Sequence, residues 1–270
     1  MMNDIVIEKT AINLEQLKIN LSKEELARFL LDNNMSNEEL DHLLSLSEYL
    51  LEKQKQAVID FCLKLSRLPL KEIKDFDSFD FTRLKGKNID ILKNLDTLST
   101  LYSRSNLAFI GPQGIGKTHL AMAFGRKCCE KGLKVYFLKA SELNDKISEA
   151  IKFNRLPRLV SDLIKPTCLI IDEVGRNVFS KENTRVFFDI VDRRYNKEGP
   201  NCMIFTSNKE PSYWNEYFDE DDSLLCSLDR IFDNALVFMM KGDSYRGKKL
   251  RTVALETVNV VTKDTTPDNK

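Results

Sequence analysis

The feature that most constrains this chain is a glycine-rich stretch, Gly111 to Thr118 (GPQGIGKT), which follows the apolar run 107–110 and precedes a helical pattern. Backbone N–H groups converge on the oxygens of a triphosphate where a glycine-rich turn leads into a helix N-terminus. The glycines supply the turn, Lys117 places a positive charge on the β and γ phosphates, and the Thr118 hydroxyl is suited to ligating Mg²⁺. The alternative, a glycine-rich turn that binds nothing, is less favoured because strand, loop and helix occur in the required order. We therefore predict a site for ATP, with contacts from Gly111, Gly114, Ile115, Gly116, Lys117, Thr118 and His119.

Strand and helix patterns alternate after this loop. Apolar runs predict strands at 107–110, 135–138, 168–171, 201–206 and 235–240, and helical spacing predicts helices at 118–131, 141–154, 157–164, 184–195 and 224–232. The run 168–171 is continuously apolar, as expected for a central strand covered on both faces. The pattern predicts an α/β fold with a doubly wound parallel sheet.

Two carboxylates close the central strand. Asp172 and Glu173 follow the run 168–171, and at the carboxyl edge of a parallel sheet they would lie beside the phosphate loop. Asp172 is suited to holding Mg²⁺ through water, and Glu173 to polarising the water that attacks the γ-phosphate. Asn208 ends the next strand and would orient that water. An acidic pair that merely closes a strand is the alternative, and proximity to the loop argues against it.

Arg230 lies on a late predicted helix, far in sequence from the loop. An arginine there would reach the γ-phosphate of a neighbouring subunit and stabilise the charge of the transition state. A surface ion pair with Asp229 or Asp233 is the alternative.

The first part of the chain has a different, helical and charged pattern. Residues 13–32 predict one or two short amphipathic helices, and a capping box at Ser36 and Glu39 begins a long helix that ends before Pro69. Cations on this helix, Lys53, Lys64 and Arg67, form either a DNA-facing edge or an ordinary solvated face. The aromatic and acidic segment 75–81 is interpreted as a linker, whose rings pack on the nucleotide domain or against an adenine ring. We expect an N-terminal helical domain at 1–75 for partner or DNA contact, an ATPase domain at 76–255 and a polar, frayed tail at 256–270.

Composition limits the remaining possibilities. Hydrophobic residues make up 42% of the chain and charged residues 30%, and the net charge is zero, so no global electrostatic pull directs the chain toward nucleic acid or membrane. The sequence has no transmembrane pattern and no signal-peptide layout at its start, which predicts a cytoplasmic protein without a membrane partner. The six cysteines form no CxxC pair, and we expect reduced thiols in the core rather than a zinc site.

At these separations the motifs resemble the IstB/DnaC branch of the AAA+ ATPases. The resemblance covers about residues 40–250 and rests on 111–121 (GPQGIGKTHLA), 169–175 (LIIDEVG), 206–208 (TSN), 227–230 (SLDR) and 242–246 (GDSYR). It implies that Lys117 and Thr118 belong to Walker A, Asp172 and Glu173 to Walker B, Asn208 to sensor 1 and Arg230 to the arginine finger. Arg246 matches the arginine of the family's GxSYR segment, which implies a sensor 2 contact to the nucleotide. The short remainder of the chain leaves no room for a full helical lid.

The resemblance implies a homo-oligomer that uses ATP and Mg²⁺, coats DNA and hands it to a partner protein. As an IstB-like transposition helper it would prefer duplex DNA and regulate a transposase. As a helicase loader of the DnaC or DnaI kind it would hold single-stranded DNA and a replicative helicase. Gly175-Arg176-Asn177-Val178 departs from the usual sequence of transposition helpers, and Arg193-Arg194-Tyr195 is more similar to loaders. A P-loop kinase acting on a small acceptor is a third class, disfavoured by Glu173, Asn208 and Arg230 together.

Overall fold

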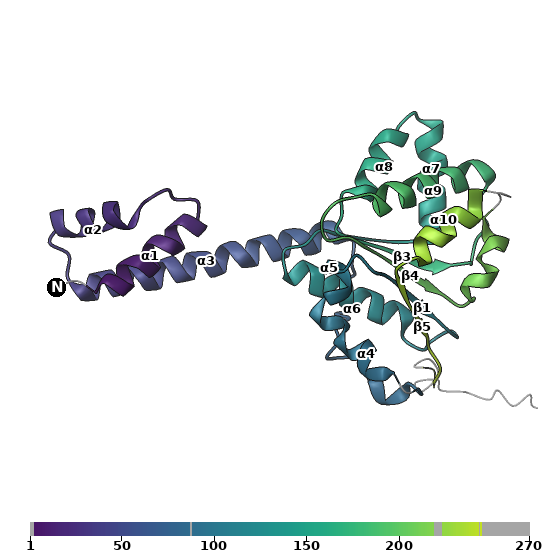
Figure 1. Cartoon of the computed structure of the whole chain (residues 1–270), viewed down its shortest axis with the longest axis horizontal. Helices are drawn as coiled ribbons and strands as arrows, with labels where there is room; N and C mark the ends of the chain where they lie inside the picture. The colour runs from purple at the N-terminus through teal and green to yellow at the C-terminus, as the bar shows by residue number, and fades with distance from the viewer. Residues whose placement is uncertain (1–2, 87, 219–222, 243, 245–270) are drawn as a thin grey trace, which may run out of the picture.

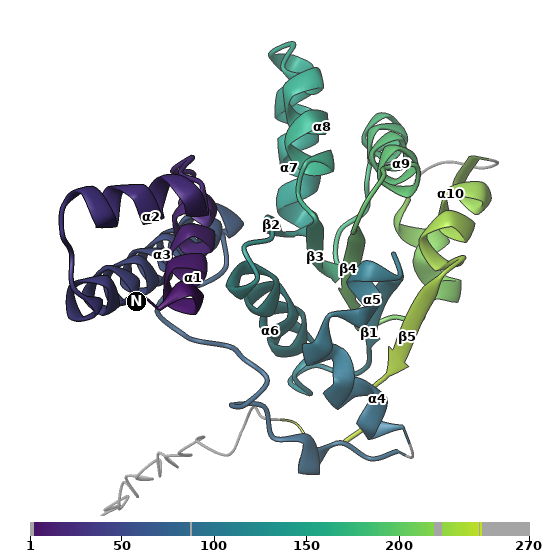
Figure 2. The ribbon, with the colours of Figure 1, turned by 60° about the vertical axis from the view of Figure 1, so that its left-hand side comes forward.

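The computed structural model describes residues 3–86, 88–218, 223–242 and 244, and it contains a five-stranded parallel sheet (Figures 1 and 2). The strand order is β2-β3-β4-β1-β5. The strands are β1 (Asn106–Ile110), β2 (Val135–Lys139), β3 (Cys168–Val174), β4 (Cys202–Ser207) and β5 (Ala235–Met239). Because β1 and β3 both pair with β4, their carboxyl ends meet at one edge of the sheet. The predicted parallel sheet is confirmed.

Helices cover both faces of the sheet, which explains the apolar strands. On one face α6 (Lys117–Glu130) packs with alternate strand residues such as Leu107 and Ile170. The other face, which includes Ala108 and Ile171, is covered by α7 (Ala140–Lys152), α8 (Leu156–Ile164), α9 (Lys181–Tyr195) and α10 (Ser223–Phe232). This two-sided covering is the doubly wound arrangement that the alternating pattern predicts.

Three helices begin the described part of the chain. They are α1 (Asp4–Gln16), α2 (Lys23–Asp32) and α3 (Asn37–Ser66), and capping boxes begin α2 at Ser22 and α3 at Ser36. The amino-terminal half of α3 packs with α1 and α2 around a small apolar cluster that includes Leu30 and Leu40. Its other end reaches the sheet, where Cys62 joins the main core, so α3 links the two parts (Figure 1). The long helix is confirmed, but the first helix begins at Asp4, earlier than predicted. The division of the chain at residue 75 stays a prediction.

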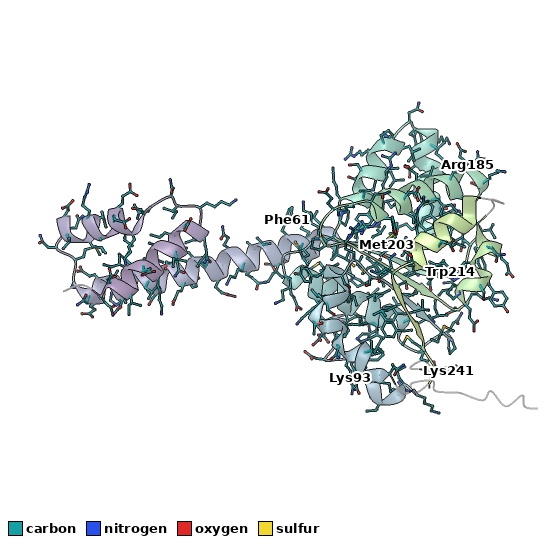
Figure 3. All side chains as sticks on the ribbon, viewed as in Figure 1. Phe61, Lys93, Arg185, Met203, Trp214 and Lys241 are labelled. Atoms are coloured by element: carbon teal, nitrogen blue, oxygen red, sulfur yellow. The ribbon has the colours of Figure 1, made fainter. Side chains whose placement is uncertain are left out.

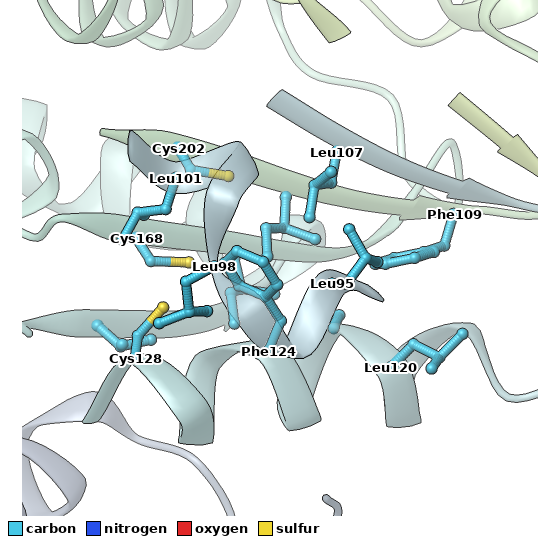
Figure 4. Packing of buried hydrophobic residues seen from close by; sticks show 14 of the residues in the cluster. Leu95, Leu98, Leu101, Leu107, Phe109, Leu120, Phe124, Cys128, Cys168 and Cys202 are labelled. Carbon is cyan, nitrogen blue, oxygen red and sulfur yellow. The ribbon is translucent and has the colours of Figure 1, made fainter. Parts of the chain in front are cut away.

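Apolar spacing over residues 88–102 predicts one continuous helix, and this prediction is wrong. The chain forms α4 (Ile89–Lys93), the 3-10 helix η2 (Asn94–Thr97) and α5 (Ser99–Tyr102). Leu98 separates η2 from α5, because its φ is +59°, and the residue is 1% exposed. The Thr97 hydroxyl donates to the carbonyl of Asn94 and accepts from the Ser99 N–H, so side-chain hydrogen bonds compete with the helix. Burial of leucines 95, 98 and 101 against the sheet outweighs helix continuity (Figure 4).

Five cysteines are buried and unpaired within the described residues, as predicted for reduced core thiols. The side chains of Cys128, Cys168 and Cys202 lie close together between α6 and the sheet (Figure 4). Burial raises the pKa of Cys129 to about 12. The described residues contain no cluster of His, Cys, Asp or Glu able to hold a metal ion, and the side chain of Cys226 lies outside them. Among the helices of the described ranges, none is both long and apolar enough to cross a bilayer.

Candidate nucleotide-binding site

The glycine-rich loop connects the end of β1 directly to α6. Gly111, Gly114 and Gly116 have φ values of +153°, +77° and +100°, a region that favours glycine. A Cβ atom added at Gly111 would overlap the carbonyl oxygen of Met240, in the segment after β5. The loop conformation therefore depends on glycine at these positions, and it leads into the N-terminus of α6 as an anion site requires.

Lys117 and Asn208 come from separate elements and meet at this loop. The Lys117 ammonium group donates to the carbonyls of Gly111 and Pro112 and to Oδ1 of Asn208, each at 2.7 Å. The lysine is 8% exposed. A buried charge requires hydrogen-bond partners, and here the loop and the end of β4 supply them. The structure thus brings together Lys117, which we expect to bind the phosphates, and Asn208, which we expect to orient the attacking water.

Asp172 lies at the end of β3 and is 2% exposed. Its Oδ1 atom accepts hydrogen bonds from the hydroxyls of Thr118, at 2.8 Å, and Thr206, at 2.5 Å. Burial raises the pKa of Asp172, and the two hydroxyl hydrogen bonds oppose that effect. The described residues place no cation in an ion pair with this carboxylate. A buried carboxylate beside a hydroxyl and without a counter-ion suits a divalent cation, since Mg²⁺ prefers oxygen ligands.

Glu173 follows in a strained position. Its φ is +60°, and the register between β3 and β4 shifts between Ile171 and Val174. Such a bulge redirects a side chain at the end of a strand. The Glu173 N–H donates to the Thr206 hydroxyl at 2.9 Å. This threonine therefore binds both the backbone of Glu173 and the side chain of Asp172.

The carboxylate of Glu173 forms two ion pairs. Lys139, the last residue of β2, lies 3.2 Å from Oε2, and Arg176 lies 2.9 Å from it. Partial burial raises the pKa of Glu173, but these cations outweigh burial and hold the pKa below its usual value. Lys139, Arg176 and Thr206 have no role predicted from the sequence. Their positions at or just after strand ends were the available signal.

A pocket of about 400 Å³ joins these groups. That volume is within the usual range for small-molecule sites. The predicted residues that line it are Gly114, Gly116, Lys117, Thr118, His119, Glu173 and Asn208, together with the unassigned Lys74, Arg176 and Lys209. Ile115 is buried in the main core, so its side chain does not face the pocket.

His119 connects the pocket to the segment before the ATPase core. Its Nε2 atom lies 2.8 Å from the carbonyl oxygen of Asp75, which fixes Nε2 as a donor, and its ring packs edge-on against Phe79 at 5.2 Å. Burial lowers the pKa of His119, although the Asp75 carbonyl partly offsets this effect. Phe79 is buried against the core, as the packing interpretation of the aromatic segment predicts.

Trp214 supports the loop after β4. It lies in the 3-10 helix η3 (Pro211–Tyr217), is fully buried, and donates from its indole nitrogen to the carbonyl of Lys209 at 3.2 Å. Its ring packs edge-on against Phe205 and Phe232, inside the sheet domain (Figure 3). This contact fixes the residue that follows Asn208, and so positions the amide beside Lys117.

Two further predicted residues, Arg230 and Arg246, are not among those that line the pocket within the described part of the chain. Arg230 does not line it, and Nη1 of Arg230 pairs with Asp192 of α9 at 2.6 Å, rather than with Asp229 or Asp233. Arg246 lies outside the described residues.

The predicted DNA-contacting cations of α3 differ in their surroundings. Lys53 lies over the ring of Tyr49, and Lys64 is exposed. Arg67 pairs with Glu142 at 2.5 Å. None of the three lines the pocket.

Comparison with known proteins decides the family. Residues 9–253 match the sequence profile of the family described as IstB-like ATP binding protein. The chain belongs to the IstB-like ATP-binding family. It is 35% identical over 218 residues to the IS5376 putative ATP-binding protein of Geobacillus stearothermophilus, covering 78% of this chain and 84% of the relative. It is 31% identical over 244 residues to the IS232 putative ATP-binding protein of Bacillus thuringiensis subsp. berliner, covering 89% and 95%.

Solved structures support the fold. AMPPCP-bound DnaA from Aquifex aeolicus aligns with a TM-score of 0.53 and 20% identity, over 65% of this chain and 51% of that one. DnaI aligns with a TM-score of 0.51 and 18% identity, over 64% and 90%. These similarities concern the fold alone, and they agree with a P-loop AAA+ arrangement. The IstB-like family and fold expected from the motifs are confirmed, and membership in this ATP-binding family supports ATP as a ligand of the chain.

Proposed function

We propose that this protein is an ATP-hydrolysing, DNA-binding AAA+ protein that assembles as a homo-oligomer on duplex DNA and regulates a transposase. The observation that carries the proposal is the convergence of Lys117, Thr118, Glu173 and Asn208 on one pocket, with the buried Asp172 hydrogen-bonded to Thr118. The relatives of the chain are named as insertion-sequence ATP-binding proteins. A binding site without hydrolysis would need the loop and the lysine, but not a carboxylate beside a strained turn.

The chain's own residues have separable tasks in this proposal. The loop N–H groups and Lys117 bind the phosphates of ATP, and Asn208 turns its amide from the lysine to the attacking water. Glu173 accepts the proton of that water, once its carboxylate is free of its cation partners. Thr206 fixes the positions of Asp172 and Glu173 relative to each other, because it hydrogen-bonds to both residues.

Thr118 and Asp172 are the residues that would hold Mg²⁺. Both present oxygen atoms, 2.8 Å apart, beside the lysine that binds phosphate. When bound, the ion neutralises charge that develops on the phosphate oxygens.

Arg230 is assigned to the site of a neighbouring subunit. It is 41% exposed in its side chain and does not line its own pocket, which suits a residue acting between subunits. Hydrolysis per subunit should then rise with protein concentration, as subunits assemble. Arg230→Ala should abolish hydrolysis while ATP binding stays close to wild type.

A mixing experiment tests this arrangement. Glu173→Gln lacks the base and Arg230→Ala lacks the arginine, so each variant alone should be inactive. Mixed subunits form some interfaces that combine an intact Glu173 with an intact Arg230, and activity should return. If the mixture stays inactive while both variants assemble and bind ATP, or if turnover is independent of concentration, the assignment of Arg230 is wrong.

Binding to duplex and single-stranded DNA of equal length, with and without ATP, tests the DNA component. ATP-dependent assembly of several subunits on duplex DNA supports the transposition helper. Preference for single strands, or binding that requires a replicative helicase, would instead favour the loader. Absence of DNA binding under every condition would refute both.

A further inference from the structure

Lys209 is a cation of the nucleotide pocket that the predicted motifs do not include. It comes directly after Asn208 in the loop that follows β4, it is exposed, and it is among the residues that line the pocket. Within the part of the chain that the structure describes, its ammonium group forms no hydrogen bond and no ion pair. The pocket therefore contains a lysine that is available to a ligand.

The other cations that line the pocket already have partners. Lys74 lies 3.2 Å from Glu72, and Arg176 lies 2.9 Å from Glu173. The lysine of the glycine-rich loop donates to three oxygen atoms. An anion that binds Lys74 or Arg176 must first displace a carboxylate, whereas an anion that binds Lys209 displaces only water.

The backbone of Lys209 is held on both sides. Its N–H donates to the hydroxyl of Ser207 at 3.0 Å, and the same hydroxyl donates to the carbonyl of Val174, at the end of β3. Its carbonyl accepts from the indole nitrogen of Trp214 at 3.2 Å. These hydrogen bonds use only main-chain atoms of Lys209. The structure therefore fixes where the side chain begins and gives the ammonium group no structural task.

The neighbours of Lys209 indicate which part of a nucleotide it would meet. Oδ1 of Asn208 lies 2.7 Å from the ammonium group of Lys117, which we expect to bind the β and γ phosphates. Lys209 is the next residue of the same loop, so its side chain enters the pocket beside this pair. A lysine carries its charge on a flexible four-carbon stem, which allows it to follow a phosphate oxygen. Lys209 thus lies at the γ-phosphate end of the site.

We propose that the ammonium group of Lys209 binds the γ-phosphate of ATP and makes the site discriminate ATP from ADP. The proposal rests on the proposed function, in which this pocket binds and hydrolyses ATP. A triphosphate would be held from two sides, by Lys117 of the loop and by Lys209 after β4. A diphosphate lacks the group that Lys209 binds, so the contact is lost when the γ-phosphate leaves. ADP would therefore bind more weakly than ATP.

The test is titration calorimetry of the full-length protein with Mg²⁺ and either a non-hydrolysable ATP analogue or ADP. Lys209→Met should weaken binding of the analogue by roughly fivefold to thirtyfold, between the effect of an exposed ion pair and that of a hydrogen bond between charged groups. Affinity for ADP should change by less than about twofold, as for an ordinary surface substitution. Lys209→Arg keeps the charge and should keep most of the affinity for the analogue.

Lys181→Met is the matched control. Lys181 is also exposed, has no ion pair within the described ranges and does not line the pocket. Its removal lowers the charge of the protein by the same amount as Lys209→Met. Both affinities should stay within about twofold of wild type in this control. Melting temperatures equal to wild type exclude misfolding of the variants.

Steady-state kinetics separate binding of the phosphate from positioning of Asn208. A contact that is equally strong in the ground state and the transition state changes KM and leaves kcat near its wild-type value, and this is the result expected for Lys209→Met. If kcat falls while affinity for the analogue is unchanged, the side chain positions the loop rather than binding phosphate, and the inference is wrong.

Two further results would overturn the inference. One is an equal loss of affinity for the analogue and for ADP in Lys209→Met. The other is the same loss for the analogue in the Lys181→Met control, which would indicate a general effect of charge. Wild-type protein that binds neither nucleotide would instead refute the proposed function, so the two failures are distinguishable before any variant is compared.

Discussion

Arg194 provides the sharpest test of how the sheet is held together. This arginine of α9 is fully buried, and no carboxylate within the described ranges pairs with it. Its Nη1 and Nη2 atoms donate instead to Oδ1 of Asn201 and to five backbone carbonyls, those of Leu163, Ile164, Pro166, Thr167 and Cys202. These carbonyls lie before the start of β3 and at the start of β4. We predict that Arg194→Met destabilises the sheet domain.

The magnitude follows from two opposing effects. Burial lowers the pKa of Arg194 from 12.5 to about 10. At about 1.4 kcal/mol for each pH unit, burying the charge costs about 3 kcal/mol, and methionine removes that cost. In the Arg194→Met variant, the carbonyl of Thr167 would still accept a hydrogen bond from the Cys202 N–H, and that of Pro166 from the Lys197 ammonium group. The carbonyl of Cys202 keeps its partner on β3, because Cys168 and Cys202 pair in the sheet. The other two carbonyls and Oδ1 of Asn201 each lose a hydrogen bond, at about 1–3 kcal/mol apiece. The expected net loss is about 3 kcal/mol of unfolding free energy.

The assay is urea unfolding followed by the fluorescence of Trp214. The chain has a single tryptophan, and its ring is fully buried beside β4 and α10, so it reports on this domain. Arg193→Met is the matched control, because the neighbouring Arg193 side chain is 59% exposed and pairs with Asp189 on the surface. Such a pair contributes at most about 1 kcal/mol. Equal unfolding free energies for the two variants would refute the reasoning.

Three further predictions concern the site. Arg176→Gln removes one ion pair from Glu173, so the pKa of that carboxyl rises toward its ordinary value. Basal ATP turnover should rise, because less free energy is needed to release the Glu173 carboxylate. The rise should be at most about fivefold, since an exposed ion pair stabilises by about 1 kcal/mol or less. The acid limb of its pH–rate profile should then move to higher pH, because the base must be ionised, and a shift to lower pH would contradict the ion-pair account. Gly111→Ala should abolish ATP binding measured by titration calorimetry, since its Cβ would overlap a backbone carbonyl, and normal affinity would show that the loop adapts. Asp192→Asn should release Arg230 without touching the pocket, so concentration-dependent turnover should be kept or increased; loss of activity in a folded variant would assign the pair a required role.

The sequence was sufficient to predict the parts of the structure that follow local rules. The loop from Gly111 to Thr118 requires glycine for its dihedral angles, and continuous apolar strands require covering on both faces, so loop and sheet were predictable. The edge where strands end was also predictable, because parallel strands place their carboxyl ends together. Asn208, which follows β4 at this edge, accordingly lies beside Lys117 in the structure, and its role toward the attacking water stays a prediction.

Long-range contacts were less predictable. The break at Leu98 depends on burial against the sheet, which spacing along the chain does not reveal. Arg194 belongs to a segment that is similar in sequence to helicase loaders, but in the structure backbone carbonyls occupy its donors, so it is not available to a partner. Lys139 is separated from Glu173 by a whole helical crossover, and their ion pair depends on the register of β2 against β3.

The contacts within the pocket suggest why assembly would control hydrolysis in such a protein. Lys117 is held by Asn208, Asp172 by Thr118 and Thr206, and Glu173 by two cations. Bound phosphates would compete for Lys117 and so would release the amide of Asn208. They would not by themselves release Glu173, because both cations approach its carboxylate from outside the loop. A single subunit would then bind ATP with its base still paired, and hydrolysis would depend on an anion or a neighbouring subunit that draws those cations away.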